Sequence, residues 1–344
     1  MTHAGCRITV HARNVVGRLG IPPKRADRKA HDRSRMRAVT ITKQGGPEVL
    51  AVRNFPVRAA GRGEVRISVK AAAVNPTDIL LRTNEAYAKG TPGIPGMDAA
   101  GVIESVGEGV DRLKVGDEVM AAVSPRRPEG GAQIELQVVP AASVVPIPSG
   151  ATLAQASTLP MNGLTALLAL DMLKLKAGET LAVSGGAGHL GSFMIALAKQ
   201  RGLRVIADAK TSETELVRSH GVDVVVARGE RFCDEVRAAT KGGADALFDT
   251  ALLGRDSFPA IRDGGAYVPV RGWDKGPAER GIRILPVFVS EALERTEWLN
   301  ELHDLASRGA IKLRVAGEYP PERAADAQRA MEAGGLRGRA VIVF

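Results

Sequence analysis

The feature that most constrains this chain is a glycine-rich turn between a predicted strand and a predicted helix. Residues 180–183 are apolar and lead into Ser184-Gly185-Gly186-Ala187-Gly188-His189-Leu190-Gly191, and residues 190–198 then follow a helical pattern. In the spacing Gly186-x-Gly188-x-x-Gly191, the first glycine permits a tight turn. The second lets backbone N–H groups approach a pyrophosphate, and the third lets the helix pack closely on the strand. The turn therefore predicts a dinucleotide site beside the positive end of a helix.

The glycine spacing counts only in its structural context, because the chain has 39 glycines and chance matches are common. Here the context is present. Further β-prone runs occupy residues 203–207, 222–226, 246–249 and 266–270, with helical patterns at 213–220, 233–239 and 257–261 between them. This alternation predicts an α/β fold with a doubly wound parallel sheet. The alternative is an α/β domain whose glycine turn binds nothing.

The remainder of the chain has a different pattern. Short strands separated by Gly and Pro fill residues 37–150, with the clearest at 65–74, 100–106, 118–123 and 134–139, which predicts a mostly antiparallel, barrel-like domain. Residues 151–170 are helical, with a break at Pro160. After the sheet pattern come a β-prone run at 282–288, helices near 291–307 and 321–332, and a last strand at 340–343.

The net charge of +9 is concentrated at one end of the chain. Residues 1–35 hold seven arginines, two lysines and two acids, so they carry +7 and leave +2 for residues 36–344. Because residues 36–344 are nearly neutral, we infer no nucleic-acid partner from the net charge. Residues 1–35 have no lasting hydrophobic period, and we expect a disordered basic extension. A targeting segment and an electrostatic docking tail are the alternatives.

Two further classes of protein are excluded by composition. The two cysteines, Cys6 and Cys233, are too few for a disulfide framework or for a structural four-cysteine zinc site. No apolar run reaches the length of about 18 residues that a membrane-spanning helix needs. We therefore expect a cytoplasmic protein with no membrane partner.

From residue 36 onward, the motifs together resemble a known family, the zinc-free medium-chain dehydrogenases/reductases of the quinone oxidoreductase type. They are, in chain order, Met36-Arg37-Ala38-Val39, Ala73-Val74-Asn75-Pro76-Thr77-Asp78, Ile94-Pro95-Gly96-Met97-Asp98-Ala99-Ala100-Gly101-Val102-Ile103, Val106-Gly107, Val115-Gly116-Asp117-Glu118-Val119, Gly163-Leu164-Thr165-Ala166 and the glycine turn. The resemblance implies a GroES-like β-barrel catalytic domain at 36–160, completed by 290–344, and a Rossmann cofactor domain at 161–289. The cofactor would lie in the cleft between them, as the switch-point rule also expects.

The same resemblance argues against a catalytic metal. Zinc relatives carry a Cys-x-x-Asp turn and a Gly-His-Glu turn, and these positions read Asn75-x-x-Asp78 and Gly96-Met97-Asp98 here. An amide and a thioether are poor zinc ligands. We therefore expect an acceptor that takes hydride without Lewis-acid help.

Several cofactor-binding residues follow from their place in the family. Asn75 would contact the nicotinamide ribose or the substrate, or else it is only a turn residue before proline. Thr165 would hydrogen-bond the carboxamide, or else bond back to its own helix. Thr250, Arg271 and Gly272 follow the fourth and fifth strands and should lie near the nicotinamide. His189 would touch the phosphates or face solvent, and Arg339 would reach the cofactor or lie on the surface.

The choice of cofactor depends on the residues after the second strand of the parallel sheet. Asp208 lies where an acid often binds the ribose 2′-OH of NAD, but the family register puts the discriminating position at Ala209. A small residue followed by Lys210 suits a 2′-phosphate. We therefore expect NADP(H), with Lys210 as a plain solvated lysine in the alternative.

Many relatives carry a tyrosine at the position of Leu80, so a protein proton donor is in doubt. Tyr87 is the nearest substitute as a weak catalytic candidate, or else a loop aromatic. We expect an NADPH-dependent oxidoreductase acting on a quinone or conjugated carbonyl. The alternatives are an enoyl or alkenal reductase, or a nucleotide-binding scaffold without turnover. The run 282–289 resembles a strand that pairs across a dimer, so we expect a homodimer.

Overall fold

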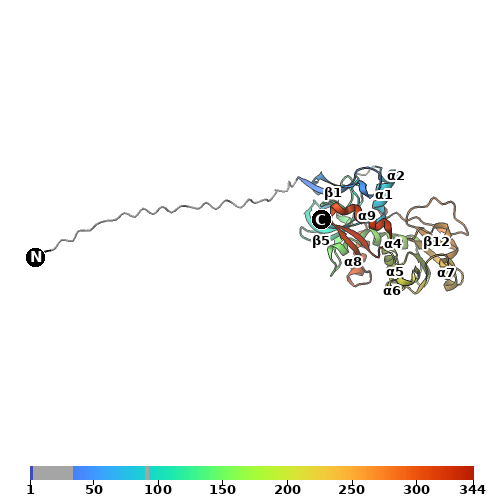
Figure 1. The fold of residues 1–344 in the computed structure, drawn as a ribbon. Helices are drawn as coiled ribbons and strands as arrows, with labels where there is room; N and C mark the ends of the chain where they lie inside the picture. Colours follow the sequence, from blue (N-terminus) through green and yellow to red (C-terminus); the bar gives the residue numbers. More distant parts are fainter. Residues whose placement is uncertain (3–33, 90–92) are drawn as a thin grey trace. The chain divides into compact units, whose positions relative to one another are not determined.

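The computed structural model describes residues 1–2, 34–89 and 93–344 (Figure 1). The predicted basic extension, apart from its ends, lies outside the described residues. The first described strand, β1 (Arg35–Ile41), begins at the motif from which the family resemblance starts and pairs antiparallel with β2 (Leu50–Pro56).

The predicted doubly wound sheet is confirmed. Within the described residues, six parallel strands lie in the order β10-β9-β8-β11-β12-β13. Their bounds are β8 (Thr180–Ser184), β9 (Arg204–Ala209), β10 (Val224–Ala227), β11 (Ala244–Asp249), β12 (Ile261–Pro269) and β13 (Arg283–Ile284). The order reverses between β8 and β11, and the carboxyl ends of these two neighbours are the place where such sheets bind ligands.

The helices of this layer are α5 (His189–Gln200), η3 (Thr211–Glu213), α6 (Thr214–Arg218), α7 (Phe232–Thr240) and η4 (Gly254–Ala260). Two predictions here need correction. Residues 257–261 are not an α-helix: η4 is a 3-10 helix containing Pro259, which has no N–H for an α-helical bond, and Ile261 already begins β12. The run 282–288 forms only a two-residue strand, although the amides of Leu285 and Val287 still donate to the carbonyls of Tyr267 and Pro269 in β12.

The second large sheet is mostly antiparallel, as predicted. Its strand order is β14-β15-β3-β4-β5-β7, and β6 also pairs with β3. The bounds are β3 (Glu64–Ala73), β4 (Asp98–Val106), β5 (Glu118–Ala122), β6 (Leu136–Pro140), β7 (Val144–Pro146), β14 (Val315–Tyr319) and β15 (Arg339–Val343). Because β15 pairs with β3, the end of the chain joins a sheet built mainly from its first half. The domain limits at 36–160, 161–289 and 290–344 stay predictions.

The remaining helices connect or cover these sheets. They are η1 (Pro47–Val49), α1 (Pro76–Thr83), α2 (Glu85–Ala88), η2 (Ala141–Ser143), α3 (Leu153–Ala156), α4 (Pro160–Leu173), η5 (Val289–Glu291), α8 (Thr296–Ser307), η6 (Pro321–Arg323) and α9 (Ala324–Ala333). The helix predicted at 291–307 is shorter than expected, because residues 292–295 do not continue it.

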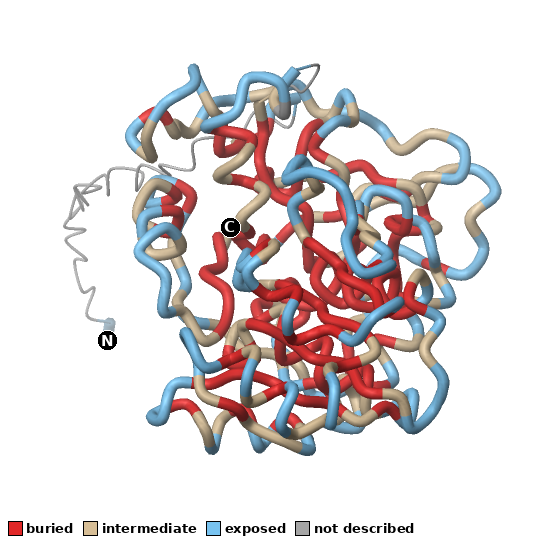
Figure 2. The backbone as a smooth tube through the Cα atoms, turned by 90° about the vertical axis from the view of Figure 1, so that its right-hand side faces the viewer, coloured by how far each residue is buried: buried red, intermediate tan, exposed pale blue. Residues whose placement is uncertain are grey.

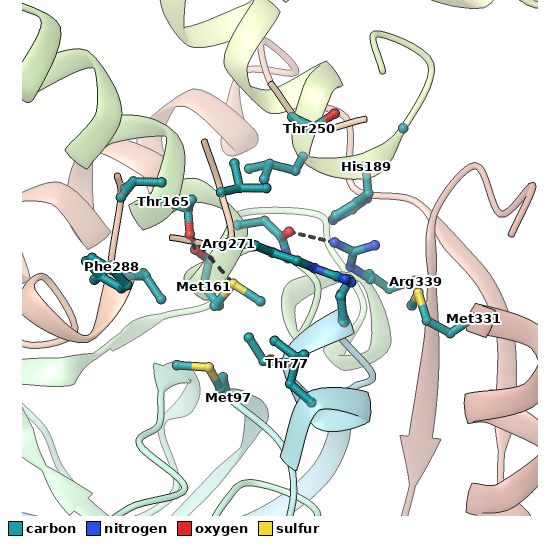
Figure 3. Close-up of a pocket in the computed structure, with 18 of the residues that line it drawn as sticks. Thr77, Met97, Met161, Thr165, His189, Thr250, Arg271, Phe288, Met331 and Arg339 are labelled. Carbon is teal, nitrogen blue, oxygen red and sulfur yellow. Dashed lines mark hydrogen bonds between the residues drawn. The ribbon is translucent and has the colours of Figure 1, made fainter. Parts of the chain in front are cut away.

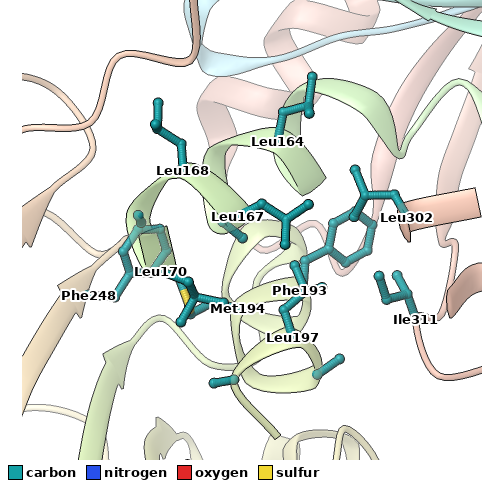
Figure 4. Packing of buried hydrophobic residues seen from close by; sticks show 14 of the residues in the cluster. Leu164, Leu167, Leu168, Leu170, Phe193, Met194, Leu197, Phe248, Leu302 and Ile311 are labelled. Atoms are coloured by element: carbon teal, nitrogen blue, oxygen red, sulfur yellow. The ribbon is translucent and has the colours of Figure 1, made fainter. Parts of the chain in front are cut away.

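A hydrophobic core that includes residues of the parallel sheet fixes the positions of helices α4 and α5. Figure 2 shows that buried segments concentrate in the interior. Helix α4 is apolar on nearly all sides, and Figure 4 shows Leu164 and Leu167 packed near Phe193 of α5 and Leu302 of α8. A Cβ at Gly163 would come within 2.7 Å of a Leu302 methyl, so this glycine lets α8 approach α4. Helix α4 is thereby fixed beside the glycine turn.

Candidate functional site

The glycine turn between β8 and α5 leaves no room for a side chain at Gly186 or Gly191 and little room at Gly188. A Cβ at Gly191 would clash with the carbonyl oxygen of Gly185. One at Gly186 would lie 2.9 Å from the Cβ of Ala207, and one at Gly188 would lie 3.0 Å from the Gly185 oxygen. Among the described residues, the amides of residues 189–191, at the start of α5, have no acceptor. These amides are free to bind an anion.

Two charged side chains, Asp208 and Arg314, hydrogen-bond to the backbone of this turn. One carboxylate oxygen of Asp208 accepts from the amides of Gly185 (2.6 Å) and Gly186 (3.1 Å), and the other accepts from Arg228 Nε (2.7 Å). Asp208 thus fixes the start of the turn, which differs from the ribose contact considered above. Burial lowers the pKa of Arg314 to about 10, and its guanidinium donates to Gly188 O (3.0 Å) and Ser192 Oγ (2.9 Å).

Arg314 was missed by sequence reasoning. It also contacts the carbonyl oxygen of Ala187, 127 positions earlier in the chain. No local pattern connects residues so far apart. By covering the carbonyls of Ala187 and Gly188, Arg314 masks negative dipoles that would repel a phosphate.

A cavity of about 650 Å³ opens beside the turn (Figure 3). Its apolar wall includes Leu80, Met97, Met161, Val270 and Phe288. Its polar lining includes Asn162, Thr165, His189, Thr250, Arg271 and Arg339. Gly188, Leu190 and Gly272 also line it. The predicted dinucleotide turn therefore forms one side of a mostly apolar cavity that is large enough for a ligand.

A chain of buried side chains leads from this cavity to a carboxylate. Arg339 Nη2 donates to Asn162 Oδ1 (2.7 Å), and Asn162 Nδ2 donates to Asn75 Oδ1 (3.1 Å). Asn75 Nδ2 then donates to Asp98 Oδ2 (2.7 Å), while the Met161 amide donates to the other oxygen (2.6 Å). Each residue donates a hydrogen bond to the next residue toward Asp98. The negative charge of Asp98 is thus connected to the positive charge of Arg339 through the side-chain amides of Asn75 and Asn162.

Asn75 therefore lies elsewhere than expected. Its side chain is fully buried, both ends of its amide are used, and it is not among the residues that line the cavity. Asn162 lines the cavity instead, and it was not predicted. The signal was present as an amide side chain in a mostly apolar helix, because a buried amide needs hydrogen-bond partners.

Burial controls the ionisation of this network. It raises the pKa of Asp98 to about 7 and that of Asp78 to about 6, although backbone donors and Arg339 oppose the shift. Asp78 accepts from the amides of Asn75 and Gly96, both at 2.8 Å. Burial also lowers the pKa of Arg339 to about 10, which leaves it charged at neutral pH.

His189 does not face solvent, which corrects one of the two alternatives. Its side chain is 2% exposed, its Nε2 lies 2.8 Å from the Thr158 carbonyl oxygen, and its ring packs 4.4 Å from that of Phe193. Its Nδ1 has no described partner. Burial, with help from Arg339, keeps the pKa of His189 well below its usual value.

The other residues expected near the nicotinamide differ in whether their side chains are already hydrogen-bonded. Thr165 bonds back to the Met161 carbonyl (2.7 Å), and Thr250 Oγ1 donates to the Ser184 carbonyl (2.6 Å). Arg271 lines the cavity and makes no hydrogen bond or ion pair with the described residues. Tyr87 belongs to α2, and its side chain lies outside what the structure describes.

Cations gather at the end of β9, where the cofactor choice was predicted to be made. Ala209 is buried and Lys210 is exposed. Glu213 accepts from Arg337 and lies 3.8 Å from Arg228 Nη1. The Lys210 backbone amide also donates to Glu213 (3.4 Å), and Arg228 donates to Asp208 as well. The side chains of Lys210, Arg228 and Arg337 thus face two carboxylates, and the excess positive charge suits an added phosphate.

Met97 and Asn75 are the residues at the two positions where zinc relatives have His and Cys, and only Met97 lines the cavity. In the part of the chain that the structure describes, no group of three or more His, Cys, Asp or Glu residues is arranged to hold a metal ion. No described helix combines the length and the apolar character needed to cross a membrane.

The site fits a dinucleotide on its own geometry. The glycines keep side chains out of the turn, and the first amides of α5 have no described acceptor. Backbone amides at the start of a helix are a binding site for the phosphates of a dinucleotide.

Comparisons with known proteins point the same way. The family model for the alcohol dehydrogenase GroES-like domain matches residues 61–149, and the zinc-binding dehydrogenase model matches residues 202–342. The chain is 31% identical to the NADPH-dependent alkenal/one oxidoreductase of Arabidopsis thaliana, over 89% of this chain and 79% of that protein. It is 29% identical to the quinone oxidoreductase of Pseudomonas aeruginosa, over 87% of this chain and 97% of that protein. A mycobacterial protein solved in complex with NADPH superposes with a TM-score of 0.77 at 27% identity, over 90% of this chain and all of the other.

Proposed function

The chain belongs to the medium-chain dehydrogenase/reductase family, and from that premise we propose that it is an NADPH-dependent oxidoreductase that needs no metal. It transfers a hydride to a quinone or to another conjugated carbonyl acceptor. The observation that carries the proposal is the junction of the glycine cradle with a cavity that Met97, rather than a histidine, lines. Quinones and activated alkenes delocalise the charge they gain, so they suit such a cavity.

In this proposal, three groups of residues bind the three parts of the cofactor. Residues 186–191 bind the pyrophosphate, with Arg314 covering the carbonyls behind them. Ala209, Lys210 and the neighbouring Arg228 bind the 2′-phosphate, and Asp208 supports the turn. Thr165, Thr250, Arg271, Gly272 and Arg339 surround the nicotinamide half, and Asn75 acts on it through Asn162.

Bound in this cleft, the reduced nicotinamide supplies two electrons and a hydrogen nucleus as a hydride. Met97, Met161 and Phe288 keep the acceptor's face dry and orient it. A reduced quinone oxygen can take its proton from water, so Leu80 in place of a tyrosine does not block that reaction. Reduction of an alkene carbon would need a positioned donor.

The test is NADPH oxidation by the purified full chain with menadione as acceptor. The rate should persist after dialysis against a chelator. A rate that the chelator abolishes would overturn the metal-free part of the proposal. Cofactor binding without turnover over a broad panel of quinones and enones would favour the scaffold alternative.

Alkenal reduction is a second candidate, favoured by the 31% identity to a plant alkenal/one oxidoreductase. NADPH that carries deuterium at its transferable position separates the two reactions. Deuterium recovered on a substrate carbon selects alkene reduction. Its absence from carbon, with hydroquinone as product, selects quinone reduction.

We also infer a cytoplasmic homodimer. The short edge strand β13 and Phe288, which is 52% exposed close after it, support pairing through residues 282–289. The scarcity of cysteine supports a reducing compartment. Light scattering during gel filtration should give twice the chain mass, and a monomer at micromolar concentration would refute the dimer.

A further inference from the structure

The first observation concerns the charges around the cavity. Its lining includes three arginines, Arg126, Arg271 and Arg339, and no aspartate or glutamate of the described chain. Arg339 is connected to the Asp98 carboxylate through two amides, and Arg126 donates to the Lys89 carbonyl (3.4 Å). Arg271 makes no hydrogen bond or ion pair with any described residue. It is therefore the one arginine of the described lining whose charge the described chain leaves unpaired.

The backbone holds Arg271 at a fixed place on the cavity wall. Residues 270–272 follow β12, and all three line the cavity. The Val287 amide donates to the carbonyl of Pro269 (3.3 Å), which anchors the end of the strand. Gly272 has a φ of +73°, which a residue with a side chain rarely adopts, so the chain turns directly after Arg271. Figure 3 shows the Arg271 side chain extending into the cavity.

The negative charges of the cofactor belong to another part of the sheet edge in the proposed function. The pyrophosphate binds at residues 186–191 after β8, whereas Arg271 follows β12, and β11 lies between these two strands. Neighbouring strands are about 4.8 Å apart, so the ends of β8 and β12 are separated by about 10 Å. A nicotinamide ring at this end carries no negative charge in either oxidation state. The charge of Arg271 is therefore available to the acceptor.

Hydride transfer creates a negative charge that a cation can stabilise. The acceptor receives two electrons and a hydrogen nucleus at one atom, and an electron pair of its conjugated system moves onto a carbonyl oxygen. That oxygen is an oxyanion until water donates a proton to it and is left as hydroxide. Donors held ready at such an oxygen are among the largest contributions to catalysis. The side chains of Met97, Met161 and Phe288, on the apolar wall, cannot supply such donors.

We propose that the Arg271 guanidinium donates to the carbonyl oxygen of the acceptor and stabilises the oxyanion that hydride transfer produces there, an assignment that rests on the proposed function. A guanidinium keeps its protons in proteins, so Arg271 holds the charge in place and water remains the acid. Arg271 is exposed before the acceptor binds. A bound acceptor displaces water from it, and the attraction between the two charges grows as the local dielectric constant falls.

Three variants separate the charge of Arg271 from its bulk. Arg271→Met removes the charge and keeps an unbranched side chain, and Arg271→Lys keeps the charge without the planar fork. Arg126→Met removes another arginine of the same lining and is the control for a general loss of positive charge. Thermal unfolding without ligand checks that all three variants fold.

The first measurement is the single-turnover oxidation of bound NADPH by menadione in a stopped-flow instrument. For Arg271→Met we expect the hydride-transfer rate to fall about 10- to 100-fold, the value of a hydrogen bond to a charged oxygen that forms as the reaction proceeds. The menadione concentration at half-maximal rate should change by about threefold or less, because the ground-state carbonyl is neutral. Arg271→Lys and Arg126→Met should each slow the transfer by about threefold at most.

The second measurement needs no turnover. In 2-hydroxy-1,4-naphthoquinone an oxygen replaces the methyl group of menadione, and its hydroxyl is ionised at neutral pH, so the two probes differ mainly in charge. Both are titrated by calorimetry into the full chain with NADP⁺ bound. Arg271→Met should weaken binding of the anion about 10-fold and binding of menadione about threefold or less. Arg271→Lys should keep both affinities within about threefold.

Three results would overturn the assignment of Arg271 and leave the proposed function standing. Equal weakening of the anion and of menadione would mean that Arg271 only shapes the cavity. Weaker NADPH binding with an unchanged hydride-transfer rate would assign Arg271 to the cofactor. A loss for Arg271→Lys as large as that for Arg271→Met would show that its charge is not what matters. If the natural protein does not oxidise NADPH with menadione, the proposed function itself fails, and the assignment fails with it.

Discussion

The two walls of the cleft are built in different ways. The glycine turn is a backbone structure, in which residues 185–191 pack so tightly that a Cβ at Gly191 would strike the Gly185 oxygen. The polar wall is a side-chain structure: Arg339 and Asn162 line the cavity, and Asn75 and Asp98 continue the hydrogen-bonded chain behind them, so that four separate segments take part. The first wall is local in sequence, and the second exists only after folding.

The two walls should therefore be sensitive to different kinds of substitution. A backbone wall fails when a side chain is added, because neighbouring main-chain atoms cannot move aside. A side-chain wall fails when a partner is removed, because the remaining buried charge is left uncompensated.

Adding one methyl group to the turn should have the largest effect. Gly191→Ala drives a Cβ into the Gly185 carbonyl, so we expect NADPH affinity to fall about 100-fold or more as the amides move. Gly188→Ala is the matched control, since its φ of −67° suits alanine and its Cβ would lie 3.0 Å from the same oxygen. Calorimetric titration should rank the two variants in this order, and equal losses would contradict the account.

Removing the buried cation should come next. Arg339→Met leaves Asp98 without its positive partner, and we expect about 2–3 kcal/mol of stability to be lost at pH 8. Arg271→Met, which removes a cavity arginine with no described partner, should cost far less. Urea unfolding of both variants measures the difference. Similar losses for the two would mean that the buried chain carries no special charge balance.

The same contrast explains what sequence reasoning could reach. The parallel sheet, the turn and the return of β15 to β3 follow from strand patterns, glycine spacing and family motifs. Asn162 and Arg314 were missed because their partners lie 87 or more positions away. The helical pattern at 257–261 misled because Pro259 favours a 3-10 turn there.

The Asn75 prediction was partly misleading for a related reason. Its place after β3 and before Pro76 indicated the cleft, and the residue does lie close behind the cavity wall. Spacing alone could not show that Asp98 and Asn162 would occupy both ends of its amide. Side-chain direction in a buried network depends on partners that only the fold supplies.

The ionisation of Asp98 should appear as a pH-dependent stability difference. Because burial raises its pKa from an ordinary 3.8 to about 7, the folded state keeps a proton that the unfolded state loses, so stability falls as pH rises through roughly 4–7. His189 and His220, whose pKa values are lowered, titrate with the opposite sign nearby. The comparison with Asp98→Asn isolates the aspartate.

We expect the unfolding free energy of the natural protein, relative to Asp98→Asn, to decrease by on the order of 2 kcal/mol between pH 5 and pH 8. Denaturant titrations at several pH values measure this. A difference that stays constant, or that grows with pH, would show that Asp98 is ionised throughout and that its donors outweigh burial.

The smallest change in affinity is expected at the end of β9, where we propose that Lys210 distinguishes NADPH from NADH. Lys210→Ala should weaken NADPH by about 5–10-fold and leave NADH unchanged, because an exposed charge contributes about 1 kcal/mol to phosphate binding. Lys114→Ala, an exposed lysine of the other sheet region, is the control. If NADPH and NADH weaken equally, Lys210 does not read the 2′-phosphate.

The most direct test of the dinucleotide site is a pair of calorimetric titrations of the purified protein, one with NADPH and one with NADH. We expect saturable NADPH binding at one site per chain, with NADH binding at least about 10-fold more weakly. Retention of neither nucleotide at millimolar concentration would refute the site, since the turn at residues 185–191 would then have no dinucleotide to hold.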